Sequence, residues 1–204
     1  MMRGRVVGIT GGVGTGKSTV LAMFKKLDAE TLDADAIYHQ LIRPGRLGWK
    51  AVVKAFGREM LHADHTIDRA RLGMIVFKDP KKRKLLEKLT HPLVRGEIDR
   101  KVALIHRSHP AKMVAVEIPL LVEAKAFKQV DAIVVVAASR KTQLERLQRK
   151  YRWMTKSQLL RIINNQLPIS VKRRHADIVI KNDGSNTETW RQVKMAWKKF
   201  AKVS

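Results

Sequence analysis

The chain contains no cysteine among its 204 residues. That absence excludes disulfides, thiolate metal ligands and a cysteine nucleophile, and it suits the reducing cytoplasm. Acidic residues are also scarce, because 18 Asp and Glu stand against 42 Lys and Arg, giving a formal net charge of +24. The shortage of negative charge predicts anionic partners, and it fits polyphosphate substrates and nucleic acids equally well.

Long apolar runs are missing as well. The first apolar run, which ends at Ile9, is too short for a signal-peptide core, and no later stretch approaches the roughly 18 uninterrupted apolar residues of a membrane helix. We therefore expect a cytoplasmic protein that does not enter the membrane. The chain also lacks internal repeats and Ser/Gly linkers, so its length predicts one compact core with small appended parts.

Short β-branched runs alternate with stretches of helical periodicity. Strands are predicted at 6–9, 30–35, 112–117, 131–137 and 176–181. Helices are predicted at 18–27, over most of 37–107, in two parts within 141–165, and at 187–203, with the long region broken at Pro44-Gly45, Gly57, Asp79-Pro80 and His91-Pro92. This alternation predicts a three-layer α/β fold around a mostly parallel sheet.

Residues 11–18 read Gly-Gly-Val-Gly-Thr-Gly-Lys-Ser, which satisfies the phosphate-loop pattern between a predicted strand and a predicted helix. Glycines let successive N–H groups turn towards phosphate oxygens, and the helix adds the positive end of its dipole. A plain glycine-rich turn is the alternative, but chance yields this pattern in roughly one chain in a hundred of this length. The predicted ATP contacts are Gly12, Val13, Gly14, Thr15, Gly16, Lys17, Ser18 and Thr19.

Within this set, Lys17 is expected to reach the β- and γ-phosphates, and the Ser18 hydroxyl to ligate Mg²⁺. Two aspartates, Asp33 and Asp35, follow at the end of the second predicted strand. Phosphoryl transfer needs a group that orients the attacking hydroxyl and accepts its proton, and an aspartate beside the γ-phosphate can do both. Aspartate is also a common helix N-cap, and these residues alone leave the two interpretations about even.

Further along, motifs follow in a fixed order: Asp33-Ala34-Asp35, Pro44-Gly45, His91-Pro92, Ile118 to Glu123, Gln166-Leu167-Pro168 with Lys172, and Ala176 to Ile180 with Asn182. With the phosphate loop, they resemble the dephospho-coenzyme A kinase family over nearly the whole chain. The resemblance implies transfer of the ATP γ-phosphate to the ribose 3′-hydroxyl of dephospho-coenzyme A, giving coenzyme A and ADP. It also implies a P-loop kinase divided into a nucleotide core at 1–36, 108–139 and 176–204, an acceptor subdomain at 37–107 and a lid at 140–175.

Positions that match the family's motifs carry implied roles. Asp35 matches the catalytic aspartate, and Asp33 its companion near the metal. The remaining implied contacts are Arg146 and Asn182 to the nucleotide, and Pro119 and Leu120 to the acceptor. His91 is also assigned to the acceptor, although a structural role in capping or orienting a helix is the favoured interpretation.

The expected lid departs from the family's pattern. The position four residues after Arg146, where a second arginine is usual, holds Lys150, flanked by Arg149 and Arg152. The sequence does not decide which of Arg149, Lys150 and Arg152 reaches the phosphates. A planar guanidinium is the better clamp for charge spread over several oxygens, and the catalytic assignment is given to Arg149. Glu117 stands where an aspartate is frequent, which leaves its role near the metal open.

Two other functions remain open from the sequence. One is a nucleoside or nucleotide kinase of similar architecture, and the other is a basic P-loop ATPase that binds nucleic acid. Weak, non-specific association with nucleic acid would need no dedicated site. The close histidine pairs, His62 with His65 and His106 with His109, lack the acidic or thiol partners of a metal centre and are interpreted as surface.

Overall fold

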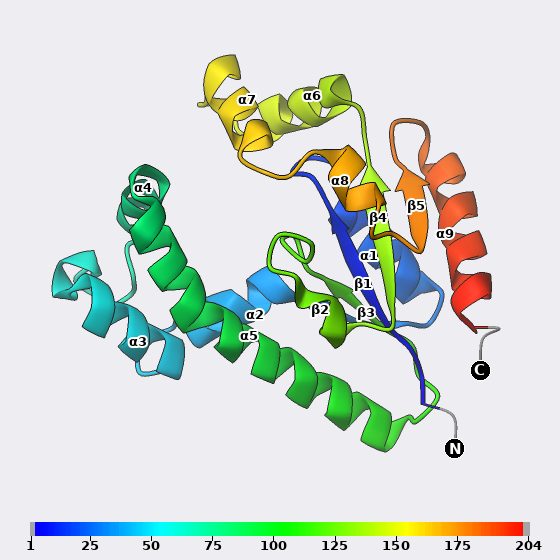
Figure 1. Cartoon of the computed structure of the whole chain (residues 1–204), viewed down its shortest axis with the longest axis horizontal. Coiled ribbons are helices and arrows are strands. Elements are labelled where there is room, and N and C mark those ends of the chain that lie inside the picture. The colour runs from blue at the N-terminus through cyan, green and yellow to red at the C-terminus, as the bar shows by residue number, and fades with distance from the viewer. Residues whose placement is uncertain (1–2, 202–204) are drawn as a thin grey trace. The chain divides into compact units, whose positions relative to one another are not determined.

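A five-stranded sheet organises the chain in the computed structural model, which describes residues 3–201 (Figure 1). The strands lie in the order β2-β3-β1-β4-β5 and all pair in parallel. Their bounds are β1 Val6–Gly11, β2 Glu30–Asp33, β3 Val114–Glu117, β4 Ala132–Ala137 and β5 Ile178–Lys181. The predicted α/β fold with a mostly parallel sheet is confirmed.

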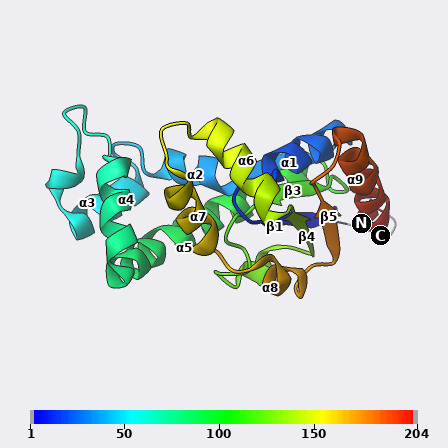
Figure 2. The ribbon, with the colours of Figure 1, turned by 90° about the horizontal axis from the view of Figure 1, so that it is seen from above.

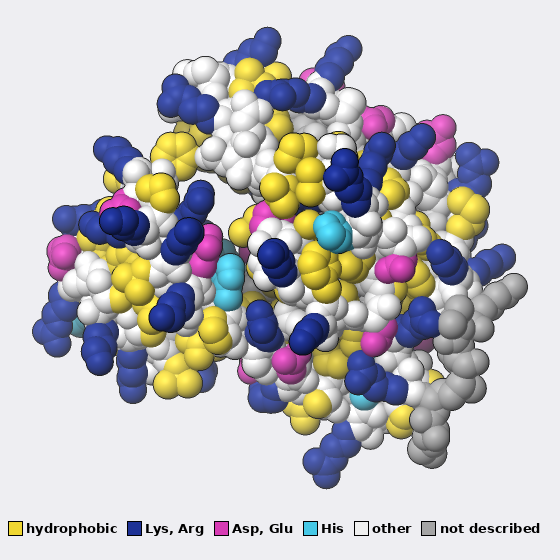
Figure 3. All heavy atoms as spheres, in the orientation of Figure 1, with side chains coloured by type: hydrophobic (Ala, Val, Ile, Leu, Met, Phe, Trp, Pro, Cys, Tyr) yellow, Lys and Arg dark blue, Asp and Glu magenta, His cyan; other side chains and the backbone are white. Residues whose placement is uncertain are grey.

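Helices connect the strands and extend beyond them. They are α1 Lys17–Lys26, α2 Ala34–Leu41, α3 Leu47–Phe56, α4 Arg69–Lys78, α5 Pro80–Ser108, α6 Arg140–Lys150, α7 Lys156–Asn164, α8 Ile169–Arg173 and α9 Asn186–Ala201, with the short 3₁₀ turns η1 Arg58–Met60 and η2 Ala126–Gln129. Within residues 3–201, no helix combines the length and apolarity that crossing a bilayer requires. Lys and Arg side chains are spread over the face drawn in Figure 3, with few acidic side chains among them.

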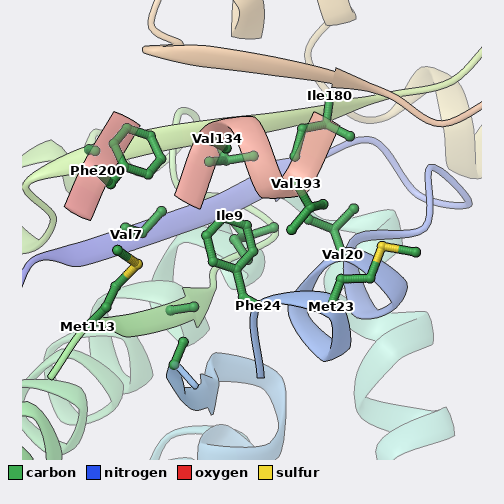
Figure 4. Close-up of a cluster of buried hydrophobic side chains, with 14 of the residues drawn as sticks. Val7, Ile9, Val20, Met23, Phe24, Met113, Val134, Ile180, Val193 and Phe200 are labelled. Carbon is green, nitrogen blue, oxygen red and sulfur yellow. The ribbon is translucent and has the colours of Figure 1, made fainter. Parts of the chain in front are cut away.

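Two compact units divide the chain: residues 3–33 with 102–201, and residues 34–101. In the first, α1 and α9 pack together against one face of the sheet, and α8 lies against β4 on the other (Figure 2). The main core fills the α1 and α9 side and includes Ile9, Phe24 and Phe200 (Figure 4). Trp190 and Trp197 pack against this core.

Strand register brings acidic residues to the carboxyl edge of the sheet. Asp33 of β2 pairs with Glu117 of β3, and Glu117 pairs with Ile9 of β1, two residues before Gly11. Because all strands are parallel, the loops that follow β1, β2 and β3 leave from the same edge. This edge is where open α/β sheets bind their ligands.

The second unit has its own smaller core. Ile42, Val52, Ile67 and Leu72 are buried there, and Tyr38 is among the partly buried side chains packed around them. The core joins α2, α3 and α4, so residues 34–101 form a helical body with its own apolar centre.

Two details differ from the sequence prediction. The second strand ends at Asp33, and Ala34 and Asp35 already belong to α2, because Asp35 suits the first turn of a helix, where a negative charge meets the positive end of the dipole. The break expected at His91-Pro92 is wrong, since α5 continues from Pro80 to Ser108 with Pro92 inside. Pro92 removes one internal hydrogen bond, and the strong helix formers around it keep the helix intact.

Candidate active site

The phosphate loop lies between the buried strand β1 and α1. The backbone of Gly14 and Gly16 has φ of 72° and 87°, a conformation that disfavours other residues. A Cβ on Gly16 would lie 2.2 Å from the Asn182 Nδ2 atom, so this position has no room for a side chain. The loop closes on itself through the Gly12 carbonyl, which accepts hydrogen bonds from the Thr15 hydroxyl at 2.8 Å and from Lys17 Nζ at 3.2 Å.

The start of α1 adds positive potential to this loop. The helix has no acidic residue in its first turn and no side-chain cap among the described residues. Its first N–H groups and its dipole therefore favour an anion, and Ser18 and Thr19 are exposed there. The loop can thus hold a phosphate group, as its sequence predicts.

Arg146 and Asn182 both lie against the loop. The Arg146 guanidinium donates to the carbonyls of Gly14 at 3.3 Å and Thr15 at 3.2 Å, and to the Asn182 carbonyl at 2.8 Å. The Asn182 amide donates to the Thr15 carbonyl at 2.8 Å and accepts from the Thr189 hydroxyl. Both residues therefore hold the loop through its backbone carbonyls. Their direct contact with ATP stays a prediction.

Gln166 contacts the phosphate loop at Val13. This contact was not predicted from the sequence. The Gln166 Oε1 atom accepts a hydrogen bond from the Val13 N–H at 2.7 Å. Gln166 follows α7 and stands 153 residues further along the chain. The contact joins the phosphate loop to the end of the predicted lid, where the chain returns to the sheet. Residues 166–172 of this stretch are called the return segment.

An ion pair between Lys172 and Glu123 was also not predicted from the sequence. Lys172 is fully buried, and its Nζ donates to Glu123 Oε1 at 2.6 Å and to the Pro119 carbonyl at 3.4 Å. The same Pro119 carbonyl accepts from the hydroxyl of Thr10, one residue before the loop. Glu123 Oε1 also accepts from the Leu167 N–H at 3.4 Å, so the return segment is held at both ends.

A pocket of about 630 Å³ opens beside the loop within the first unit. Gly12 and Thr15 of the loop are among the residues that line it, and Arg140, Arg173 and Lys181 add positive charge. This volume lies within the range of about 300–1,000 Å³ that is usual for small-molecule sites. The pocket can therefore hold the rest of a nucleotide whose phosphates lie in the loop.

Asp183 is the acidic group of this pocket. Burial raises the pKa of its carboxyl, but hydrogen bonds from the Ser139 N–H at 2.6 Å and the Thr142 hydroxyl at 2.8 Å outweigh burial, and the pKa lies below its ordinary value. Asp183 thus stays ionised and anchors the start of α6 at Ser139.

The predicted acidic residues divide between the two units. Asp33 and Glu117 are neighbours across β2 and β3 in the first unit, and Asp35 is exposed in the first turn of α2 in the second. Burial raises the pKa of the nearby Tyr38 hydroxyl; the charge of Arg69 opposes that rise and the charge of Asp35 adds to it. Tyr38 therefore lies within the field of Asp35, which the sequence did not indicate.

The other predicted residues are distributed as follows. Pro119 and Leu120 lie in the turn after β3, and His91 lies within α5 in the second unit. Arg149 is exposed in the last turn of α6, and both it and Lys150 lie within ~60° of Arg146 around the helix at about 100° per residue. The roles of these residues in catalysis or acceptor binding stay predictions.

Magnesium suits the oxygen atoms at this edge of the sheet. Ser18 is the second residue of α1, which follows β1, and Asp33 ends β2, so a hydroxyl and a carboxylate lie at the same edge of the sheet. Mg²⁺ prefers such ligands, and it usually takes the remainder from water and substrate phosphates. Within residues 3–201, the structure contains no group of three or more His, Cys, Asp or Glu side chains that could hold a metal ion.

Comparison with known proteins places this geometry in a family. The family profile of dephospho-CoA kinase matches residues 5–188. Dephospho-CoA kinases of Bacillus cereus and Listeria monocytogenes are 38% and 39% identical, over 96% and 98% of both chains respectively. The solved dephospho-CoA kinase of Campylobacter jejuni superposes with a TM-score of 0.69 at 25% identity, over 97% of both chains.

These relatives are ATP-dependent kinases by family, and the comparisons give no support to a nucleic-acid partner. The match covers the phosphate loop, both aspartates, the whole unit of residues 34–101, and the segment that contains Gln166 and Lys172. This chain therefore belongs to the dephospho-CoA kinase family.

Proposed function

We propose that this chain transfers the γ-phosphate of ATP to the 3′-hydroxyl of dephospho-CoA, giving coenzyme A and ADP. The choice of these two substrates rests on the match to the family profile over residues 5–188. The phosphate loop supports ATP as the donor, because its amide groups and Lys17 suit a triphosphate. The expected cytoplasmic location and the division into core, acceptor subdomain and lid belong to the same proposal.

Asp35 acts as the base in this proposal. As the 3′-oxygen attacks the γ-phosphorus, its proton passes to the Asp35 carboxylate, and the bond from the γ-phosphorus to the bridging oxygen breaks to release ADP. Lys17 and the loop amides hold the phosphates in line and stabilise the charge on the leaving group. Mg²⁺, when held by Ser18 and Asp33, neutralises part of the phosphate charge.

The lid residues complete the site. Arg146 orients the loop through its carbonyls, and Arg149 of α6 supplies positive charge to the phosphates. Closure of the lid would exclude water and protect ATP from hydrolysis. His91, Pro119 and Leu120 are assigned to binding of the acceptor.

A substitution of Gln166 tests whether its hydrogen bond to Val13 positions the phosphate loop for ATP. Gln166→Ala removes the acceptor of the Val13 N–H, and the KM for ATP is expected to rise about three- to tenfold, the equivalent of one hydrogen bond. The melting temperature should change little, because the side chain is only partly buried. Steady-state kinetics checks this, with Asn165→Ala, an exposed neighbour, as the matched control. An unchanged KM for ATP would show that the contact does not position the loop.

The proposed activity is tested by ADP release across a panel of acceptors. With Mg-ATP and dephospho-CoA, we expect stoichiometric ADP and a product phosphorylated at the 3′-oxygen, identified by mass spectrometry. Nucleoside monophosphates should give turnover at least about a hundredfold lower, because the acceptor unit would bind the larger ligand through more contacts. Turnover with monophosphates alone would instead assign the chain to a nucleotide kinase.

A further inference from the structure

The ion pair between Lys172 and Glu123 takes no step in the proposed reaction, and its place in the interior is costly. The Lys172 side chain is fully buried and that of Glu123 is 21% exposed, with 2.6 Å between Nζ and Oε1. Charges lose their hydration on burial, and their mutual attraction often fails to exceed that cost. A pair of apolar side chains would therefore stabilise this place as well or better.

One atom of the pair adds to this cost. Within residues 3–201, Glu123 Oε2 is buried and accepts no hydrogen bond from the protein. A carboxylate oxygen that is buried without a donor lowers the free energy of unfolding, because water solvates it in the unfolded chain. Stability alone thus does not explain the pair, and an explanation lies in the segments that it joins.

The pair ties the return segment to the turn after β3. Lys172 belongs to α8, and its Nζ also donates to the Pro119 carbonyl at 3.4 Å. Glu123 follows β3, and its Oε1 also accepts from the Leu167 N–H at 3.4 Å. Residues near both ends of the return segment are therefore held to the same turn.

Each of the two joined segments also contacts the phosphate loop or the strand before it. Gln166, next to Leu167 in the chain, accepts from the Val13 N–H at 2.7 Å. The Pro119 carbonyl accepts at 3.1 Å from the hydroxyl of Thr10, the second-last residue of β1. Two short series of contacts thus lead from the ion pair to the backbone of the loop.

An ion pair can position these segments more precisely than an apolar contact. The Lys172 ammonium donates to a carboxylate and to a carbonyl, which fixes the distance and the direction between its partners. Apolar side chains in the same place would accept several packings. The hydrogen bond between Gln166 and Val13 needs this precision, because N–H···O bonds keep to about 2.7–3.2 Å.

We propose that Lys172 and Glu123 are a positioning pair, which holds the return segment where Gln166 can support the phosphate loop in its ATP-binding conformation. The pair acts through Gln166 and not by contact with ATP. The inference rests on the proposed function only in that the loop binds ATP, and the acceptor does not enter it. Loss of the pair therefore affects the use of ATP and spares the use of dephospho-CoA.

Replacement of both charged side chains by apolar ones separates positioning from stability. Lys172→Met with Glu123→Leu leaves no charge unpaired, so the melting temperature should stay equal or rise. The dissociation constant for ATP, measured by calorimetry, should nevertheless rise about tenfold, and the KM for ATP with it. The KM for dephospho-CoA should change less than about twofold. An equally stable variant that binds ATP as the unmodified chain does would overturn the proposal.

A double-mutant cycle tests whether the pair acts through Gln166. Gln166→Ala alone should raise the dissociation constant for ATP about three- to tenfold. Combined with Lys172→Met and Glu123→Leu, the same substitution should add less than about twofold, because the hydrogen bond to Val13 is already lost. Fully additive effects would show that the pair does not act through Gln166.

Lys112→Met with Asp28→Asn is the matched control. It removes another ion pair of the first unit, which lies at the amino end of β2 and β3, away from the loop. Asparagine suits position 28, where φ is 73°. This control should bind ATP within about twofold of the unmodified chain, and a loss equal to that of the apolar variant would overturn the proposal.

Two further arms keep the test decisive. If the apolar variant does not fold, Glu123→Gln takes its place, because it keeps the shape of the side chain and one acceptor oxygen; the dissociation constant for ATP should rise about threefold, and an unchanged value would overturn the proposal. ATP binding is measured without an acceptor. An unmodified chain that bound ATP but did not phosphorylate dephospho-CoA would therefore refute the proposed function, and the result for the positioning pair would still stand.

Discussion

Asparagine in place of Asp35 is expected to lower turnover about a hundred- to ten-thousandfold while ATP affinity stays nearly unchanged. The carboxamide keeps the shape of the side chain and can still accept a hydrogen bond from the acceptor hydroxyl. It cannot take up the proton that this hydroxyl must lose. Because Asp35 is exposed in the first turn of α2, the substitution should leave the fold intact.

Separate measurement of kcat, the KM for each substrate and the dissociation constant for ATP distinguishes this loss from impaired binding. Asp99→Asn is the matched control, because it makes the same charge change at an exposed position of α5 in the second unit. Its kcat should stay within about twofold of the unmodified chain. A variant of Asp35 that kept full kcat would show that another group accepts the proton.

Lys17→Ala is expected to lower kcat/KM for ATP about a hundred- to a thousandfold. The Lys17 ammonium lies at the mouth of the loop, bonded to the Gly12 carbonyl at 3.2 Å, and in the proposed reaction it balances charge that builds up on the γ-phosphate. A loss of this kind appears in kcat and in ATP binding together. Initial rates and calorimetric titration with ATP measure the two effects.

The control for this change is Lys25→Ala, which removes the same charge from an exposed position at the far end of α1. If the general positive charge of the protein attracted ATP, the two variants would lose affinity alike. Instead, Lys25→Ala should behave like the unmodified chain at physiological salt, where surface charges are screened beyond ~8 Å.

The phosphate loop and the order of strands and helices could be predicted because their signals are local. Eight consecutive residues define the loop, and short β-branched runs mark β1, β3, β4 and β5 of the parallel sheet. The same reasoning places Asp33 near the end of the second strand, although that strand was predicted to continue to Asp35. The register that sets Asp33 beside Glu117 depends on strand pairing and cannot be predicted from either segment alone.

Gln166 and Lys172 could not be recognised as loop supports from the residues alone. Their partners, Val13 and Glu123, stand 153 and 49 residues away in sequence, and no periodicity links them. A lysine is also expected at the surface, whereas Lys172 is fully buried and paired. Such contacts arise from tertiary packing, and an ordered set of family motifs was the sole sequence signal that included both residues.

The continuous helix α5 shows the limit of proline as a signal. A proline predicts a helix boundary because it removes one hydrogen bond and crowds the preceding turn. Here Pro92 lies between long stretches of helix formers, which tolerate that loss of about 3 kcal/mol. His91 is therefore a residue in the middle of a helix, and the predicted role as a helix cap does not apply to it.

The central claim, that Asp35 directs the acceptor hydroxyl to the terminal phosphate of ATP, is tested most directly by a crystal structure of the chain with a non-hydrolysable ATP analogue and dephospho-CoA. The decisive distance joins an Asp35 carboxylate oxygen to the ribose 3′-oxygen. We expect about 2.6–3.2 Å, with the 3′-oxygen in line with the γ-phosphorus. A closed complex in which another residue contacts the 3′-oxygen while Asp35 points elsewhere would contradict the account.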